Sequence, residues 1–83
     1  MSRHEIPGRS PGTTVFVGWD HPLMTYFVQV YDTASSEEGP AVWLGASWRE
    51  IYDLDDLKRA IRRHADLTEE LGATLYRDRD EGR

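Results

Sequence analysis

Few residues in this chain are able to do acid–base chemistry, and they are poorly placed for it. Asp20 and His21 are adjacent, and a carboxylate beside an imidazole can form a catalytic base or a ligand pair. Adjacent residues in a turn point apart, and no serine or cysteine nucleophile motif accompanies them. Asp20 is better explained as an acceptor of backbone hydrogen bonds within a turn. We therefore predict no catalytic residue and no enzymatic activity.

Candidate metal ligands also lack a suitable spacing. His4, His21 and His64 form no H-x-x-x-H pattern, and the chain has no cysteine. Glu37 and Glu38 are paired carboxylates of a kind that can bind a divalent cation, but a solvated loop tip explains them better. A further acidic group is explained by helix capping; it consists of Asp53, Asp55 and Asp56. We expect neither a metal site nor a cofactor.

A group of four basic residues is the best candidate for contact with an anionic partner. Residues 32–57 hold seven acids and one base, whereas residues 58–64 hold four bases and no acid. Positions 58 and 62 are one helical turn apart, as are 59 and 63, so the four cations share one helix edge. The alternative is a solvated helix end. This basic edge consists of Lys58, Arg59, Arg62 and Arg63.

Length and composition restrict the class of protein. A chain of 83 residues allows one domain, and its formal charge of −5 disfavours non-specific binding to nucleic acid. No apolar run approaches the length of a membrane span, and the first residues lack the apolar stretch of a signal peptide. Together with the absence of cysteine, these features favour a cytoplasmic protein with no membrane contact.

The elements that position these residues indicate an α+β fold. Gly and Pro punctuation predicts a flexible N-terminal arm at 1–12, one domain at 13–78 and a frayed charged tail at 79–83. Runs of β-branched and aromatic residues predict a three-stranded antiparallel meander, with strands at 13–18, 23–31 and 41–46. The segment 47–52 is ambiguous between a helical turn and an extended connector.

Two C-terminal helices are expected after the sheet. Asp53 can cap the first, with Asp56 completing an acidic capping box, and apolar residues follow at helical spacing. Thr68 is the expected N-cap of the second helix, which presents Leu71 and Leu75 on one face.

Alternation of side chains gives the sheet two apolar faces. One face is aliphatic, with Val15, Val17, Val28, Val30, Val42 and Leu44. The other is aromatic, with Phe16, Phe27, Tyr31 and Trp43, although a register using Tyr26 in place of Phe27 and Tyr31 remains open. Trp19 and Trp48 are placed at its rim. Since one pair of helices covers one face, the aromatic face is a candidate partner surface. The alternatives are helices divided between the faces, a cover formed by the arm and the segment 47–52, and a base-stacking platform.

Part of the chain resembles a family of small bacterial proteins. The runs GWDHPLMTYFVQVYD and PAVWLGASWREIYDLDDLKRAI carry the resemblance, which covers about residues 15–61. Its pattern is a strand ending in Gly-Trp-Asp-x-Pro-Leu, an aromatic strand, a Trp-x-Gly segment and a Leu-rich helix. The resemblance implies a stand-alone bacterial domain, in some cases carried on plasmids or mobile elements. It brings no activity, substrate or catalytic residue.

These observations favour a non-enzymatic bacterial interaction module that self-associates through the aromatic sheet face, as a homodimer or with another protein. The alternative is a small regulatory protein that contacts nucleic acid, or a nucleic-acid-binding protein, through its basic edge or acidic loops.

Overall fold

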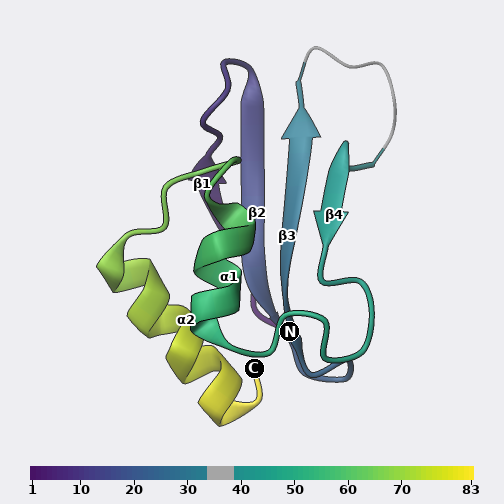
Figure 1. The fold of residues 1–83 in the computed structure, drawn as a ribbon, viewed down its shortest axis with the longest axis vertical. Helices are drawn as coiled ribbons and strands as arrows, with labels where there is room; N and C mark the ends of the chain where they lie inside the picture. The colour runs from purple at the N-terminus through teal and green to yellow at the C-terminus, as the bar shows by residue number, and fades with distance from the viewer. Residues whose placement is uncertain (34–38) are drawn as a thin grey trace.

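A computed structural model describes residues 1–33 and 39–83 of the chain. In these residues an antiparallel sheet precedes two C-terminal helices (Figure 1), which confirms the predicted α+β class. The strands are β1 His4–Pro7, β2 Thr13–Asp20, β3 Thr25–Asp32 and β4 Val42–Leu44, and the helices are α1 Leu54–Ile61 and α2 Glu69–Glu81. The carboxylate pair Glu37 and Glu38, considered above as possible cation ligands, lies outside the described residues.

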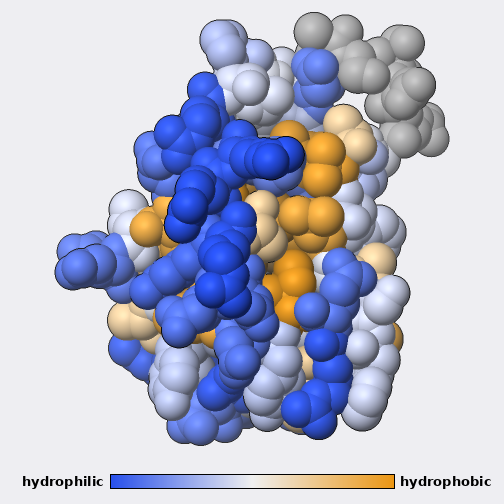
Figure 2. Space-filling model, in the orientation of Figure 1, coloured by the Kyte–Doolittle hydropathy of each residue, from blue (hydrophilic) through white to orange (hydrophobic). Residues whose placement is uncertain are grey.

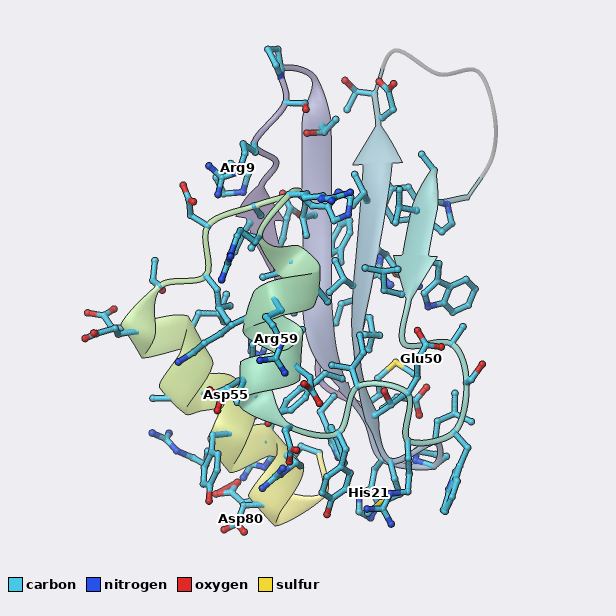
Figure 3. The ribbon with its side chains drawn as sticks, in the orientation of Figure 1. Arg9, His21, Glu50, Asp55, Arg59 and Asp80 are labelled. Carbon is cyan, nitrogen blue, oxygen red and sulfur yellow. The ribbon has the colours of Figure 1, made fainter. Side chains whose placement is uncertain are left out.

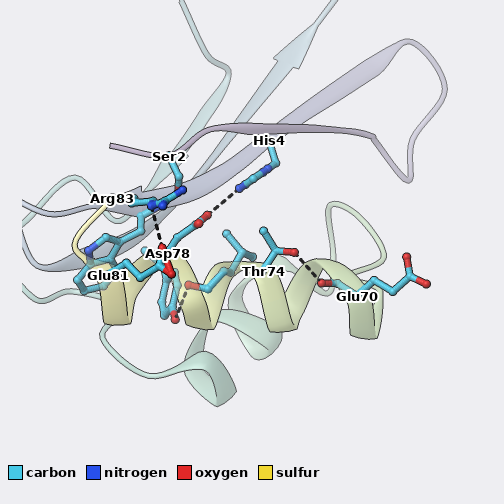
Figure 4. A network of polar contacts seen from close by, with 10 residues as sticks. Ser2, His4, Glu70, Thr74, Asp78, Glu81 and Arg83 are labelled. Atoms are coloured by element: carbon cyan, nitrogen blue, oxygen red, sulfur yellow. Dashed lines mark hydrogen bonds and ion pairs between the residues drawn. The ribbon is translucent and has the colours of Figure 1, made fainter.

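The prediction of three strands is wrong, because the segment expected to form an N-terminal arm contributes a fourth. β1 pairs antiparallel with β2, and the sheet order is β1-β2-β3-β4. Ile6 lies opposite Val15 and packs against the core. His4 Nε2 lies 2.8 Å from Asp78 Oδ2 of α2 (Figure 4), so this strand is fastened to the helix layer as well as to the sheet.

The strand register confirms the predicted aliphatic face. Val15 pairs with Val30, and Val17 pairs with Val28, which also faces Leu44 of β4. Helix residues Leu57, Ile61 and Leu75 belong to the same core cluster. Both helices therefore pack on one face of the sheet, forming a second layer beside it (Figure 1). The helices are not divided between the two faces.

The helix ends agree only in part with the caps and boundaries predicted from the sequence. Thr68 caps α2, where its hydroxyl accepts a hydrogen bond from Leu71 N at 3.1 Å. Asp53 is the N-cap residue of α1 but makes no capping hydrogen bond with its side chain; its carboxylate lies 3.8 Å from Arg79 instead. Helix α2 ends at Glu81 and includes three of the residues expected in a frayed tail, because the left-handed Gly82 closes it by donating its N–H to Arg79 O.

Tyr26 occupies the core between the sheet and α2. It is fully buried, and its hydroxyl donates to Leu75 O at 3.3 Å. Its position excludes the alternative register that placed Tyr26 on the partner face. Burial raises the pKa of Tyr26 from 10.0 to about 12, an effect opposed by the nearby guanidinium of Arg79.

This pKa predicts a loss of stability at alkaline pH. The folded state disfavours the phenolate of Tyr26. Its contribution to the free energy of unfolding is therefore complete below pH 10 and is lost between about pH 10 and 12. The loss amounts to at most about 2–3 kcal/mol. Denaturant unfolding across this range measures it. Tyr26→Phe should flatten the decline, whereas Tyr76→Phe, on an exposed tyrosine, should retain it. An equal decline in both variants would contradict the assignment to Tyr26.

Candidate functional site

The sheet face opposite the helices, here called the open face, carries the aromatic residues singled out in the sequence. Cross-strand register places one residue from each strand in a single transverse row. In this row Glu5 of β1 faces Phe16, Phe16 faces Gln29, and Gln29 faces Trp43 of β4. Residues of all four strands thus form one continuous surface, on which neither α1 nor α2 packs.

The four predicted contact residues differ greatly in exposure. Trp43 is 55% exposed on the short edge strand, whereas Phe27 is only 4% exposed. Phe27 lies opposite Gly18, where an added Cβ would come within 2.9 Å of the Phe27 ring and 2.1 Å of Ser2 O. The N-terminal residues therefore cover this part of the sheet, and Phe27 forms the floor of the surface. Phe16 and Tyr31 are partly buried beside it and meet edge to face, with ring centroids 5.5 Å apart.

Arg3 is the residue of the open face that the sequence did not reveal. Its guanidinium carbon lies 4.0 Å from the centroid of the Phe16 ring, and Nη1 donates to Gln29 Oε1 at 3.1 Å. A small hollow of about 30 Å³ separates Arg3 from Trp43 and is floored by Phe27. The predicted cover by the N-terminal segment is thus present over Phe27, Phe16 and Gln29, but it leaves Trp43 exposed. The segment 47–52 does not share in it, since its buried Ile51 packs into the core on the helix side.

The helix side presents a different surface. Figure 2 shows hydrophilic residues along the helices and an apolar strip beside α1, toward β4. This strip is consistent with the part-buried Val42 and Leu44, which project from β4 toward the helix side. The exposed β4 edge therefore has apolar side chains on both of its faces.

The predicted basic edge lies on the helix side, away from the open face. All four of its cations are exposed. Arg59 pairs with Asp56 one turn earlier, and Lys58 and Arg62 line a shallow hollow of about 220 Å³ together with Arg9. Arg9, labelled in Figure 3, comes from the segment before β2. It donates to Arg62 O at 3.0 Å and also binds Asp66. Contact of this edge with an anionic partner stays a prediction.

Asp20 and His21 serve the β2–β3 hairpin. Asp20 Oδ1 accepts a hydrogen bond from Leu23 N at 3.3 Å, which confirms its turn role, and His21 Nδ1 lies 3.3 Å from Trp19 Nε1. Trp19, expected at the rim, is fully buried instead. Its side chain follows the core face, because it lies opposite Tyr26 in the register.

Residues 1–33 and 39–83 contain no group of three or more His, Cys, Asp or Glu side chains arranged to hold a metal ion. In the same residues, no helix is long and apolar enough to cross a membrane.

The fold and this surface define a small α+β protein with a four-stranded antiparallel meander, helices on one face and an aromatic open face. In comparisons with known proteins, no family model, no curated protein and no solved structure matches the chain.

Proposed function

We propose that this protein is a non-enzymatic interaction module that self-associates through its open face. The observation that carries the proposal is the transverse row ending at Trp43, which exposes a large aromatic side chain on the sheet face opposite α1 and α2. Exposed tryptophans surrounded by partly buried aromatics are typical anchors of protein interfaces, where a few residues carry most of the binding energy.

The row suits an isologous contact between two copies of the chain. In a two-fold arrangement the same patch meets itself in reverse order, so Trp43 of one copy faces the β1 side of the other. That side presents Arg3, whose guanidinium already stacks on Phe16 and offers its second face to another aromatic ring. Glu5 beside it supplies a polar rim. The contact between Trp43 and Arg3 would form twice across the two-fold axis, which favours a second copy as the partner.

Absolute mass measured by light scattering after size exclusion tests self-association. We expect about twice the 9.6 kDa of one chain at high protein concentration. Trp43→Lys should weaken the dimer by roughly 30-fold or more, since an aromatic anchor residue is worth about 2 kcal/mol.

The matched control is Trp48→Lys, which should leave the dimer intact. Trp48, expected at the rim of the aromatic face, is exposed in the segment before α1 and stacks with Arg49, which in turn contacts Tyr52 on the helix side. Circular dichroism would show that both variants remain folded. A monomer at every concentration, or equal effects of the two variants, would contradict self-association through this face.

A further inference from the structure

A second exposed aromatic surface lies at the end of the helix layer, distinct from the open face. Three aromatic rings alternate with two guanidinium groups in the order Trp48, Arg49, Tyr52, Arg79, Tyr76. Arg49 lies 5.4 Å from the Trp48 ring centroid and 4.3 Å from that of Tyr52. Arg79 lies 4.9 Å from the Tyr52 ring centroid and 5.1 Å from that of Tyr76. We call this series the aromatic–arginine ladder.

Backbone contacts hold the loop that supplies three of the five ladder residues. Arg49 has a left-handed φ of 54° and donates its N–H to Leu23 O at 2.9 Å. Ile51 is buried and exchanges hydrogen bonds with β3, since its N–H donates to Thr25 Oγ1 at 2.8 Å and its carbonyl accepts from Tyr26 N at 2.7 Å. Trp48 is therefore presented outward from a fixed backbone, at 66% exposure.

Both ends of the ladder are exposed aromatic rings. Tyr76 is 52% exposed, and like Trp48 it stacks on one guanidinium. The alternating series of rings and guanidinium groups therefore ends on both sides with a solvent-exposed aromatic ring. A further guanidinium group is suited to extend such a series. The negative face of an aromatic ring attracts cations, and the planar guanidinium group stacks well on it.

The groove beside Tyr76 has the charge that such a cation needs. It has a volume of about 470 Å³ and is lined by Asp53, Leu54, Asp55, Asp56, Arg59, Tyr76 and Arg79. Both guanidinium groups are already engaged, Arg59 with Asp56 and Arg79 with Asp53 at 3.8 Å. Asp55 has no ion pair within residues 1–33 and 39–83. The groove thus has one carboxylate in excess of its cations, and the exposed ring of Tyr76 lines the same groove.

We propose that this groove docks an arginine-bearing segment of a partner protein, with the arginine stacked on Tyr76 and paired with Asp55. The ring selects the planar guanidinium over a compact ammonium group. The carboxylate disfavours a nucleic-acid strand, since the phosphate backbone would face the excess negative charge. The proposal does not depend on self-association, because none of the ladder residues belongs to the open face.

Titration with a short, capped peptide containing two arginines, followed by amide NMR shifts, tests the proposal. We expect saturable shifts at Asp55, Tyr76 and Arg79, and about threefold to fivefold weaker binding of the same peptide with lysine in place of arginine. Tyr76→Ala and Asp55→Asn should each weaken binding about threefold or more; both positions are exposed, so the fold should be retained.

Two controls separate this site from general attraction to an acidic protein. Glu70→Gln removes the same charge near the other end of α2 and should leave peptide affinity unchanged, as should Trp43→Lys on the open face. Equal weakening by Glu70→Gln, or no saturable shift at millimolar peptide, would overturn the proposal. So would shifts at Tyr76 that follow protein concentration, which would indicate a second copy, or tighter binding of a single-stranded oligonucleotide.

Discussion

Gly45→Ala is expected to destabilise the protein by about 2–5 kcal/mol. Gly45 follows β4 with φ of 79°, a left-handed conformation that costs a non-glycine residue about 1–2 kcal/mol. An added Cβ would also lie 2.0 Å from Tyr26 O and 2.8 Å from Phe27 Cα. Both atoms belong to the backbone of the central strand β3, so relief requires movement of the sheet and not a change of rotamer. Overpacking of this kind adds a further 1–3 kcal/mol or so.

Gly39→Ala provides a matched control for this prediction. Gly39 has φ of 90°, but an added Cβ would meet no atom of residues 1–33 and 39–83 within 4 Å. Its substitution should therefore cost only the conformational part, about 1–2 kcal/mol. Urea unfolding of both variants measures the difference. Equal losses of stability would show that the close approach of Gly45 to β3 contributes nothing.

The sequence predicts the two faces of the sheet well, because alternation in an antiparallel strand follows from backbone geometry alone. Val15, Val17 and Val28 could be assigned to one face without knowledge of the fold. The register then followed from the need to bury aliphatic side chains together. For the same reason, the aromatic character of the opposite face could be recognised before its exposure was known.

The N-terminal strand was missed because its apolar signal is weak. Only Ile6 in β1 is aliphatic, and Pro7 with the following Gly8 is typical of a loop. Contacts with residues distant in the sequence fix this segment. Ser2 N donates to Trp19 O at 3.0 Å, and His4 contacts Asp78, which lies 74 positions away. Neither Trp19 nor Asp78 can be recognised as a partner from the residues around positions 2–4. For this reason the position of Arg3 on the open face could not be predicted either.

The aromatic–arginine ladder shows the same limit at the other end of the molecule. Trp48, Arg49 and Tyr52 are close in sequence, and their segment was recognised only as ambiguous. The two remaining members, Tyr76 and Arg79, belong to α2, and the backbone carbonyl of Tyr52 accepts a hydrogen bond from Arg79 Nη1 at 3.0 Å. Periodicity places Tyr76 and Arg79 on one side of a helix. It does not say which loop that side faces.

Trp19→Ala is expected to cost about 3–5 kcal/mol, the range for removing a large buried aromatic side chain. Trp19 is fully buried, and its ring lies edge to face with Tyr26 and Tyr52 at centroid distances of 5.0 and 6.1 Å. The substitution leaves a cavity where the β2–β3 hairpin and the loop before α1 meet. Because a domain of this size has only about 4–12 kcal/mol of stability, the variant should be marginally folded.

Two further tryptophan variants test whether this loss of stability comes from the buried position of Trp19. Trp48→Ala, on an exposed ring, should change stability by no more than about 0.5 kcal/mol. Trp19→Phe retains most of the buried area but loses the Nε1 contact with His21, so its cost should lie between the other two. Guanidinium unfolding followed by circular dichroism gives the order of stability. If Trp19→Ala were as mild as Trp48→Ala, the Gly-Trp-Asp-x-Pro-Leu segment would not anchor the core. If the predicted order holds, the tryptophan of that segment has a structural role that needs no ligand to explain it.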